Sequence, residues 1–368
     1  MDNEKIMEQQ DMQVVLITGS SGRLGAATVK QLSKTHRVIG FDRAGDPHPP
    51  PEAECVCVDL TSDESLAAGM ERVREGYGTT IASVVHYAAY YDFSGEPSPK
   101  YEEVTVRGTE RLLEALRPFE VEQFIFSSTM LVHAPCNLDQ RIDEDWPLEP
   151  KWDYPQSKVA TEKVISSHRG STKAVNLRIA GVYNDECNSI PLAHQIERIF
   201  ERKLTSRVYP GDPSSGQAFV HLDDVVDAVA RCIERRTQLP EESAILIGEP
   251  TTLGYGELQT EFGQLIHNEP WETKTIPKSL AKTGAWVQDN MPLAEEPFIK
   301  PWMVDLADDH YALDIQRAEK LLDWRPARSL RDTLPKMVAA LKRDPVDWYR
   351  KNGLEPPSWL EDYEPADS

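Results

Sequence analysis

Short apolar runs alternate with amphipathic stretches along the first two thirds of the chain. The runs are rich in Val, Ile, Leu and Phe and have the length of buried strands; they lie at 14–17, 37–42, 55–60, 81–89, 124–126, 175–179 and 244–248. Helices are predicted between them, at 26–32, after Ser62, at 99–117, at 153–168, at 190–202 and after Asp224. This alternation predicts an α/β fold, a doubly wound parallel sheet whose ligand lies at the carboxyl ends of the strands.

The alternation stops at Thr251. The stretch 265–303 is irregular and contains Trp271, Trp286 and Trp302, which either line an aromatic pocket, fill a domain core or form a subunit interface. Two further helices are predicted near 315–322 and 330–341, and an acidic, proline-bearing segment follows them.

The first strand runs into a glycine-rich turn, Gly19-Ser20-Ser21-Gly22-Arg23-Leu24-Gly25, and then into a helix. The start of a helix offers free N–H groups and partial positive charge to a phosphate, and glycines let the backbone approach it closely. An ordinary strand–loop–helix corner would use similar residues. The position of this turn ahead of a second predicted strand favours a nucleotide site.

Asp42 ends that second strand, where a carboxylate binds the ribose hydroxyls of adenosine in dinucleotide sites. A carboxylate repels a 2′-phosphate, so this position favours NAD over NADP. The adjacent Arg43 works against that preference, because an arginine accepts a phosphate or stacks on adenine.

Tyr154 and Lys158 lie one turn apart on the same face of a predicted helix, and Thr129 ends the fifth predicted strand. A lysine ammonium lowers the pKa of a nearby phenol, which then takes a proton from an alcohol while hydride leaves its carbon for NAD. His86 is also a candidate for catalysis. Its place inside a buried strand favours a hydrogen-bonded core histidine instead.

The composition narrows the class of protein. A formal net charge of −21 argues against a nucleic acid or an anionic membrane as partner, and no window approaches the ~20 apolar residues of a membrane span. The polar, acidic start lacks the features of a signal peptide. Cys55 and Cys57 alternate within a predicted strand, so their side chains point to the same side of it. They could bind a metal together, but the favoured interpretation is that they are two buried thiols. We expect a soluble cytoplasmic protein without a metal.

The joint motifs resemble those of the extended short-chain dehydrogenase/reductase family, the NAD-dependent epimerases and dehydratases of nucleotide sugars, over residues 13–341. The matching segments are 18–25, Asp42, 59–60, 86–89, 127–129, 154–158, 177–178 and 219–224. The resemblance implies that Tyr154 is the acid and base, that Lys158 stabilises its phenolate and anchors a ribose, and that Thr129 contacts the substrate oxygen. It also implies a homodimer formed through the helices at 99–117 and 153–168.

The motifs and the resemblance together give one expected cofactor site. Its residues are Gly19, Ser21, Gly22, Arg23, Leu24, Gly25, Asp42, Arg43, Asp59, Leu60, Tyr87, Ala88, Ala89, Ser127, Tyr154, Lys158 and Val182.

The resemblance further implies a Rossmann sheet and a smaller C-terminal α+β domain that closes over the substrate. We therefore divide the chain into a disordered tail at 1–12, an NAD-binding domain at 13–180 to which 215–250 returns, a substrate-binding domain at 181–214 and 251–343, and a C-terminal tail at 344–368.

Three departures from the family pattern narrow the chemistry. Met130 and Leu131 follow Thr129, where sugar 4,6-dehydratases have an acid and a base, so dehydration is disfavoured. Gln217 occupies the position of an arginine that holds pyrophosphate, and 304–309 lacks a second one, although Asn188 is present. We expect Tyr91, Asn188 and Gln217 to contact the substrate.

We therefore expect an NAD-dependent oxidoreductase or epimerase that acts on a secondary alcohol or its ketone. A sugar derivative fits this description, and a typical UDP-sugar is disfavoured. The alternative is a regulatory protein that binds NAD(P) without turnover, which usually lacks the tyrosine and lysine that are intact here.

Overall fold

The computed structural model describes residues 12–43, 48–92, 95–282 and 301–362. Its centre is a parallel sheet with the strand order β12-β8-β7-β5-β1-β2-β3, which confirms the predicted doubly wound Rossmann architecture. In that order the strands are β12 (Glu242–Ile247), β8 (Lys173–Ile179), β7 (Gln123–Thr129), β5 (Ser83–His86), β1 (Val14–Thr18), β2 (Arg37–Asp42) and β3 (Glu54–Cys57).

Helices cover both faces of this sheet, because each strand buries alternate side chains on opposite sides. Val15 and Ile17 of β1 pack into one apolar cluster with helices α2 (Arg23–Leu32), α7 (Leu222–Glu234) and α11 (Gln316–Leu322). Val14 and Leu16 pack into another, with helices α3 (Asp63–Tyr77), α4 (Arg107–Leu116) and α5 (Asp153–His168). The π-helical segment η1 (Tyr101–Val106) precedes α4, so the helix predicted at 99–117 has two parts.

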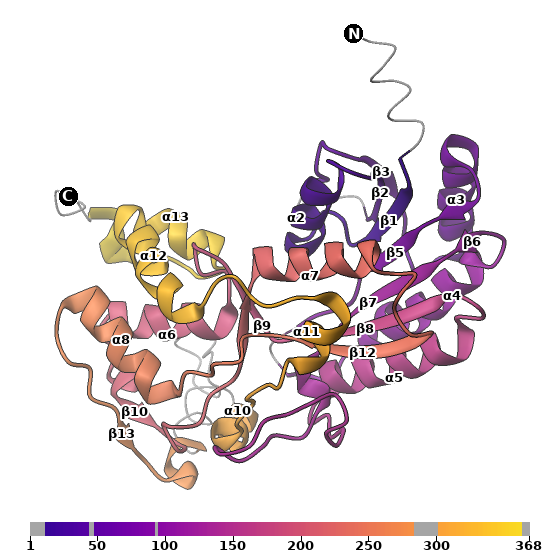
Figure 1. Ribbon diagram of the computed structural model, residues 1–368. Helices are drawn as coiled ribbons and strands as arrows, with labels where there is room; N and C mark the ends of the chain where they lie inside the picture. The colour runs from indigo at the N-terminus through magenta and orange to yellow at the C-terminus, as the bar shows by residue number, and fades with distance from the viewer. Residues whose placement is uncertain (1–11, 44–47, 93–94, 283–300, 363–368) are drawn as a thin grey trace.

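A second lobe lies beside the sheet, on the left of Figure 1. Helices α6 (Ile190–Phe200), α8 (Tyr255–His267), α12 (Leu330–Arg343) and α13 (Pro345–Lys351) share a third apolar cluster. Trp271 is 2% exposed within it, so this tryptophan belongs to a core. Trp286 lies outside the described residues.

The remaining elements are short. They are β4 (Thr80–Ile81) paired with β6 (Glu120–Val121), β9 (Gly181–Tyr183) paired with β11 (Phe219–His221), β10 (Val208–Tyr209) paired with β13 (Lys274–Thr275), α10 (Pro301–Asp305), and the turns of 3-10 helix η2 (Met130–Val132), η3 (Leu204–Arg207), η4 (Leu306–Asp308) and η5 (Ser358–Asp362).

The C-terminal segment corrects one prediction. Residues 344–368 were expected to be a tail, yet 345–351 form α13 and 358–362 form η5. Asp344 caps α13 by accepting a hydrogen bond from the Asp347 N–H, and Trp348 and Tyr349 are buried in the second lobe. The segment is acidic overall, and this composition led to the prediction of a tail although the segment also contains apolar residues that pack into the lobe. The predicted tail at the other end falls almost entirely on residues 1–11, which lie outside the described residues.

Two smaller expectations also change. The expected strand at 81–89 ends at His86, and 87–89 leave the sheet as a loop. Cys57 is exposed and Cys55 is half-buried, so they are not two buried thiols; β3 is the edge strand, which leaves one side of it uncovered. Within the described ranges, no group of His, Cys, Asp and Glu could hold a metal ion, and no helix is long and apolar enough to cross a membrane.

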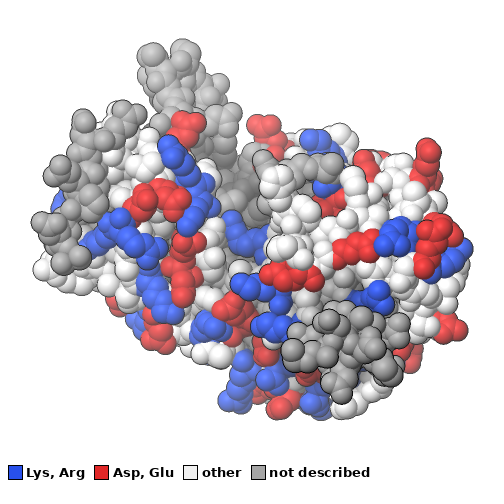
Figure 2. Space-filling model, turned by 90° about the horizontal axis from the view of Figure 1, so that it is seen from above, with Lys and Arg blue, Asp and Glu red and all other residues white. Residues whose placement is uncertain are grey.

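Acidic and basic side chains are interspersed on the face of the molecule in Figure 2. Exposed ion pairs of the described residues include Arg325 with Glu319 and Arg331 with both Glu257 and Glu261. Exposed pairs of this kind each contribute little to stability.

Candidate active site

A cavity of about 1380 Å³ lies at the carboxyl ends of the strands. It brings together every residue expected from the sequence to contact cofactor or substrate except Ser21 and Lys158, including Tyr91, Asn188, Gln217 and Val182. Residues that were not assigned to this site from the sequence also line it, among them 99–100, 102–104, 179–181 and 189–191. These residues belong to none of the motifs recognised in the sequence, so their place in the cavity could not be predicted.

The glycine-rich turn forms one wall of the cavity, and it has no room for a side chain at Gly19 or Gly25. Gly19 has φ +69°, and a Cβ there would lie 2.8 Å from the backbone nitrogen of Ala88. A Cβ at Gly25 would collide with the Gly19 carbonyl. Helix α2 begins after Gly22, and no side chain caps it, so the N–H groups of its first turn are left for a ligand. This close, uncapped backbone fits a pyrophosphate.

Two carboxylates follow along the cavity. Asp42 accepts hydrogen bonds from the N–H groups of Ser21 (2.7 Å) and Arg43 (2.8 Å), so it is fixed beside the turn. Ser21 itself is buried behind this contact. Asp59 accepts from the N–H and hydroxyl of Thr61, and these bonds hold the pKa of its carboxyl below the ordinary value. The Asp59 carboxylate therefore stays charged.

Thr129 and Tyr154 meet at the deep end of the cavity. Thr129 ends β7, Tyr154 lies in the first turn of α5, and a hydrogen bond joins their side chains. Burial raises the pKa of Tyr154 to about 12, and the bond to Thr129 opposes that rise. Tyr91 contacts the Tyr154 ring edge-to-face, with 4.9 Å between the ring centroids. The resting side chain is therefore a neutral phenol on a hydrogen-bonded, aromatic wall.

Lys158 lies one helical turn further and is 3% exposed. Its Nζ donates to the Ser127 carbonyl at 2.7 Å and is 5.7 Å from the centroid of the Tyr154 ring. Burial lowers the pKa of Lys158 to about 7, and Glu162, one further turn along α5, opposes that fall. The ammonium therefore lies beneath the cavity and next to the phenol.

Glu162 belongs to a buried network that the sequence did not reveal. It forms an ion pair with Arg178 of β8 at 2.8 Å and accepts a hydrogen bond from the Ser128 hydroxyl at 2.5 Å. Arg178 also donates to the Glu144 carbonyl and to His133. The one available signal was the spacing of Lys158 and Glu162, which puts both on the same face of α5.

His86 is fully buried and has the role predicted for it. Its ring nitrogens bond to the hydroxyls of Thr18 (2.6 Å) and Thr109 (2.9 Å), and burial lowers its pKa to about 3. It is therefore a neutral core residue that ties β1 and β5 to α4.

Asn188 links the cavity to the second lobe. Its carbonyl accepts from Arg23 of α2, and its N–H donates to the Asn352 side chain at 2.7 Å. Its own side-chain amide donates to Asn184. The glycine-rich turn and the C-terminal segment therefore contact the same residue.

Replacement of Lys158 by methionine is expected to change how stability depends on pH. The folded-state pKa of about 7 lies below the ordinary 10.5, so between these values the folded protein binds fewer protons than the unfolded chain. Wild-type stability therefore rises with pH across this window, and the penalty for burying the charge is fully present below it.

Chemical unfolding from about pH 6 to about pH 10 measures this effect. The unfolding free energy of Lys158→Met minus that of the wild type should fall as the pH rises. Lys163→Met, an exposed position on the same helix, is the control and should give a constant difference. A constant difference for Lys158→Met as well would contradict the lowered pKa.

Comparisons with known proteins give the following similarities. A family model described as "NAD dependent epimerase/dehydratase family" matches residues 15–248. The uncharacterized UDP-glucose epimerase YtcB of Bacillus subtilis is 23% identical over 345 residues, covering 89% of this chain and 97% of the relative. Short-chain dehydrogenase/reductase family 42E member 1 of Mus musculus is 28% identical over 282 residues, covering 71% and 67%.

Solved structures resemble the fold over most of its length. The UDP-glucose 4-epimerase of Thermus thermophilus in complex with NAD has a TM-score of 0.69 at 22% identity, covering 90% of this chain and all of that one. The UDP-glucuronic acid 4-epimerase of Bacillus cereus, in complex with UDP-glucuronic acid and NAD, has a TM-score of 0.67 at 19% identity, covering 90% and 99%. At these identities the likeness concerns the fold.

Proposed function

Because the chain belongs to the NAD-dependent epimerase/dehydratase family, we propose that it is an NAD-dependent oxidoreductase or epimerase acting at a secondary alcohol or ketone carbon. One observation carries the proposal. Tyr154 bonds to Thr129 above the buried Lys158, inside the cavity that begins at the glycine-rich turn. These are the groups that moving a proton on and off an alcohol requires.

The cavity supports a specific seating of the cofactor. The first turn of α2 would hold the pyrophosphate, Asp42 the adenosine ribose, and Asp59 and Leu60 the adenine. Tyr87, Ala88, Ala89, Ser127 and Val182 would line the remainder, and Lys158 would reach the second ribose. When bound, NAD supplies a hydride acceptor that can also return the hydride.

The chain's own residues handle the proton. Thr129 would hold the substrate oxygen by a hydrogen bond, and Tyr154 would take the hydroxyl proton in oxidation and give it back in reduction. Since the resting pKa of Tyr154 is about 12, the phenolate needs a positive charge beside it, and Lys158 would supply one in its protonated form, which is held below a pH of about 7. Met130 and Leu131 have no ionisable group, so an elimination step finds no acid or base at these two positions.

Turnover of candidate alcohols and ketones by the purified protein tests this function. Native mass spectrometry first shows whether NAD or NADP is retained. A dehydrogenase then changes the NADH absorbance, whereas an epimerase forms a stereoisomer with no net NADH. Retention of cofactor without any turnover would support a regulatory protein instead.

Exchange of Asp42 for asparagine is expected to lower the ratio of NAD affinity to NADP affinity about tenfold or more. A tenfold change in this ratio corresponds to ~1.4 kcal/mol of binding free energy. Asparagine keeps an acceptor for the Ser21 and Arg43 N–H groups but removes the charge that repels a 2′-phosphate. Titration of both cofactors measures the ratio. An unchanged ratio would mean that the adenosine ribose does not lie at Asp42.

Assembly and location are also part of the proposal. Helices α4 and α5 pack side by side on one face of the sheet, which supports the homodimer expected through them. All five cysteines are free, which supports a reducing compartment such as the cytoplasm.

A further inference from the structure

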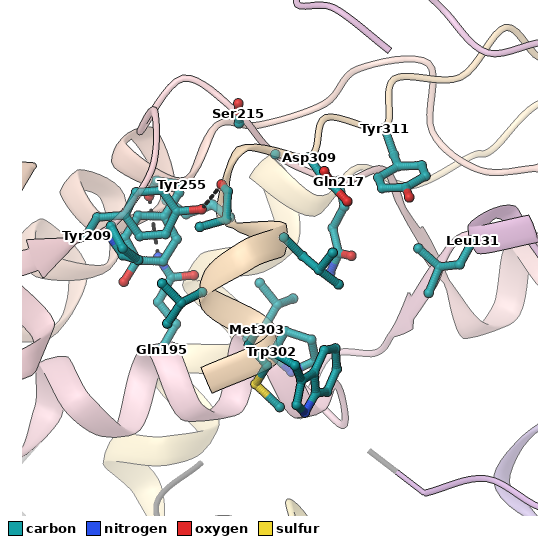
Figure 3. A pocket seen from close by; sticks show the side chains of 18 of the residues that line it. Leu131, Gln195, Tyr209, Ser215, Gln217, Tyr255, Trp302, Met303, Asp309 and Tyr311 are labelled. Atoms are coloured by element: carbon teal, nitrogen blue, oxygen red, sulfur yellow. Dashed lines mark hydrogen bonds between the residues drawn. The ribbon is translucent and has the colours of Figure 1, made fainter. Parts of the chain in front are cut away.

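A second cavity of about 310 Å³ adjoins the cofactor cavity. Leu131, Pro191 and Gln217 line both, so the two are continuous. Figure 3 shows Leu131 at one end of this chamber and the rings of Tyr209 and Tyr255 at the other. A molecule that reacts at Tyr154 can therefore extend past Leu131 into the chamber.

Most of the chamber wall is aromatic or aliphatic. Tyr209 and Tyr255 stack with 3.9 Å between their centroids, and the Tyr209 hydroxyl already donates to the Ala307 carbonyl, so its ring face is what the pair offers. Trp302 of α10 contacts Trp152, which precedes α5, at 4.3 Å between centroids. Such walls favour flat apolar groups.

Three charged side chains line the chamber, and two of them neutralise each other. Lys151 forms an ion pair with Asp309 at 2.8 Å. The third, Arg198 of α6, has no ion pair or side-chain hydrogen bond with any other residue in the described ranges, and its Nε is buried without a partner. A buried donor of this kind is unfavourable until an acceptor reaches it.

We propose that this chamber binds the non-reacting part of the substrate, and that this part is an apolar ring system with one anionic group held by Arg198. The proposal rests on the proposed function, because it takes Tyr154 as the reacting end. A diphosphate fits poorly, since its charges call for several donors and the described wall has one unpaired cation. A single carboxylate or sulfonate matches one guanidinium.

A pair of fluorescent probes tests the chamber without turnover. Anilinonaphthalene sulfonate carries apolar rings and one anion, and N-phenylnaphthylamine carries the same rings without it. Both are titrated in the presence of saturating NAD, so that the cofactor cavity is blocked. Both should bind the wild type. Arg198→Met should weaken the sulfonate about tenfold or more and change the neutral probe less than about twofold.

Two further variants test whether the probes bind in the chamber. Arg202→Met removes an arginine just beyond α6 that pairs with Glu269, and both affinities should stay as in the wild type. Trp302→Ala removes part of the wall and should weaken both probes. Thermal unfolding of each variant shows that it is folded.

Three results would overturn the proposal: equal affinity of Arg198→Met and wild type for the sulfonate, equal weakening of both probes by Arg198→Met, or displacement of both probes by UDP-glucose. Failure of the proposed function is a separate outcome. If the probes behave as expected while no alcohol or ketone is turned over, the proposed binding by the chamber is supported and the proposed catalytic function is contradicted.

Discussion

Tyr154→Phe is expected to reduce turnover roughly a thousandfold while leaving NAD affinity and the unfolding temperature close to wild type. The phenylalanine ring fills the same space and keeps the edge-to-face contact with Tyr91. Only the hydroxyl is lost, and with it the group that exchanges a proton with the substrate. Steady-state turnover of an identified substrate, together with calorimetric titration of NAD, measures both quantities.

Tyr77→Phe is the matched control. Its hydroxyl is also hydrogen-bonded, to Glu54 at 2.5 Å, but it lies on α3 and outside the cavity. This variant should keep full turnover. Full turnover of Tyr154→Phe would remove the tyrosine from the mechanism. A loss of turnover that ran parallel to a loss of NAD binding would point to a disturbed cavity instead.

Arg178→Met is expected to destabilise the protein by about 3–5 kcal/mol, the largest effect on stability among the substitutions proposed. Arg178 and Glu162 are 6% and 8% exposed, so removal of the arginine leaves a buried carboxylate without its counter-charge. The Ser128 hydroxyl alone does not replace it. Urea unfolding measures the loss.

The double variant Glu162→Leu/Arg178→Met separates the ion pair from packing. With both members of the pair gone, neither Glu162 nor Arg178 is left buried without its counter-charge, so the double variant should be more stable than Arg178→Met alone. If the double variant lost the sum of the two single effects, the residues would not act as a pair. Because Glu162 also opposes the lowered pKa of Lys158, its removal should lower that pKa further.

The sheet could be predicted because parallel strands buried on both faces have near-continuous apolar sequences. The meeting of Thr129 and Tyr154 followed from the fold, since strand ends and helix starts share one edge of such a sheet. The partner of Glu162 could not be predicted in this way. It depends on how α5 packs over β7 and β8, which places Arg178 beneath it, opposite Ser128 in the strand register.

The second lobe was harder to predict for the same reason. Tyr209 and Tyr255 are far apart in the sequence, and only the packing of α8 beside β10 stacks them. The chamber that they close has no sequence motif. Trp348 and Tyr349 lay within an acidic segment, and their burial depends on helices that begin much earlier in the chain.

The packing of the C-terminal segment into the second lobe also affects the order in which the two parts of the molecule can fold during synthesis. Residues up to Trp324 complete the apolar cluster that joins α2 and α7 to the sheet, whereas the second lobe takes its last members, Leu354 and Leu360, from the end of the described chain. Because a ribosome releases a chain from its first residue onward, the apolar cluster around the sheet can be completed before that of the second lobe. The lobe that carries the chamber is completed only after Leu360 has been synthesised.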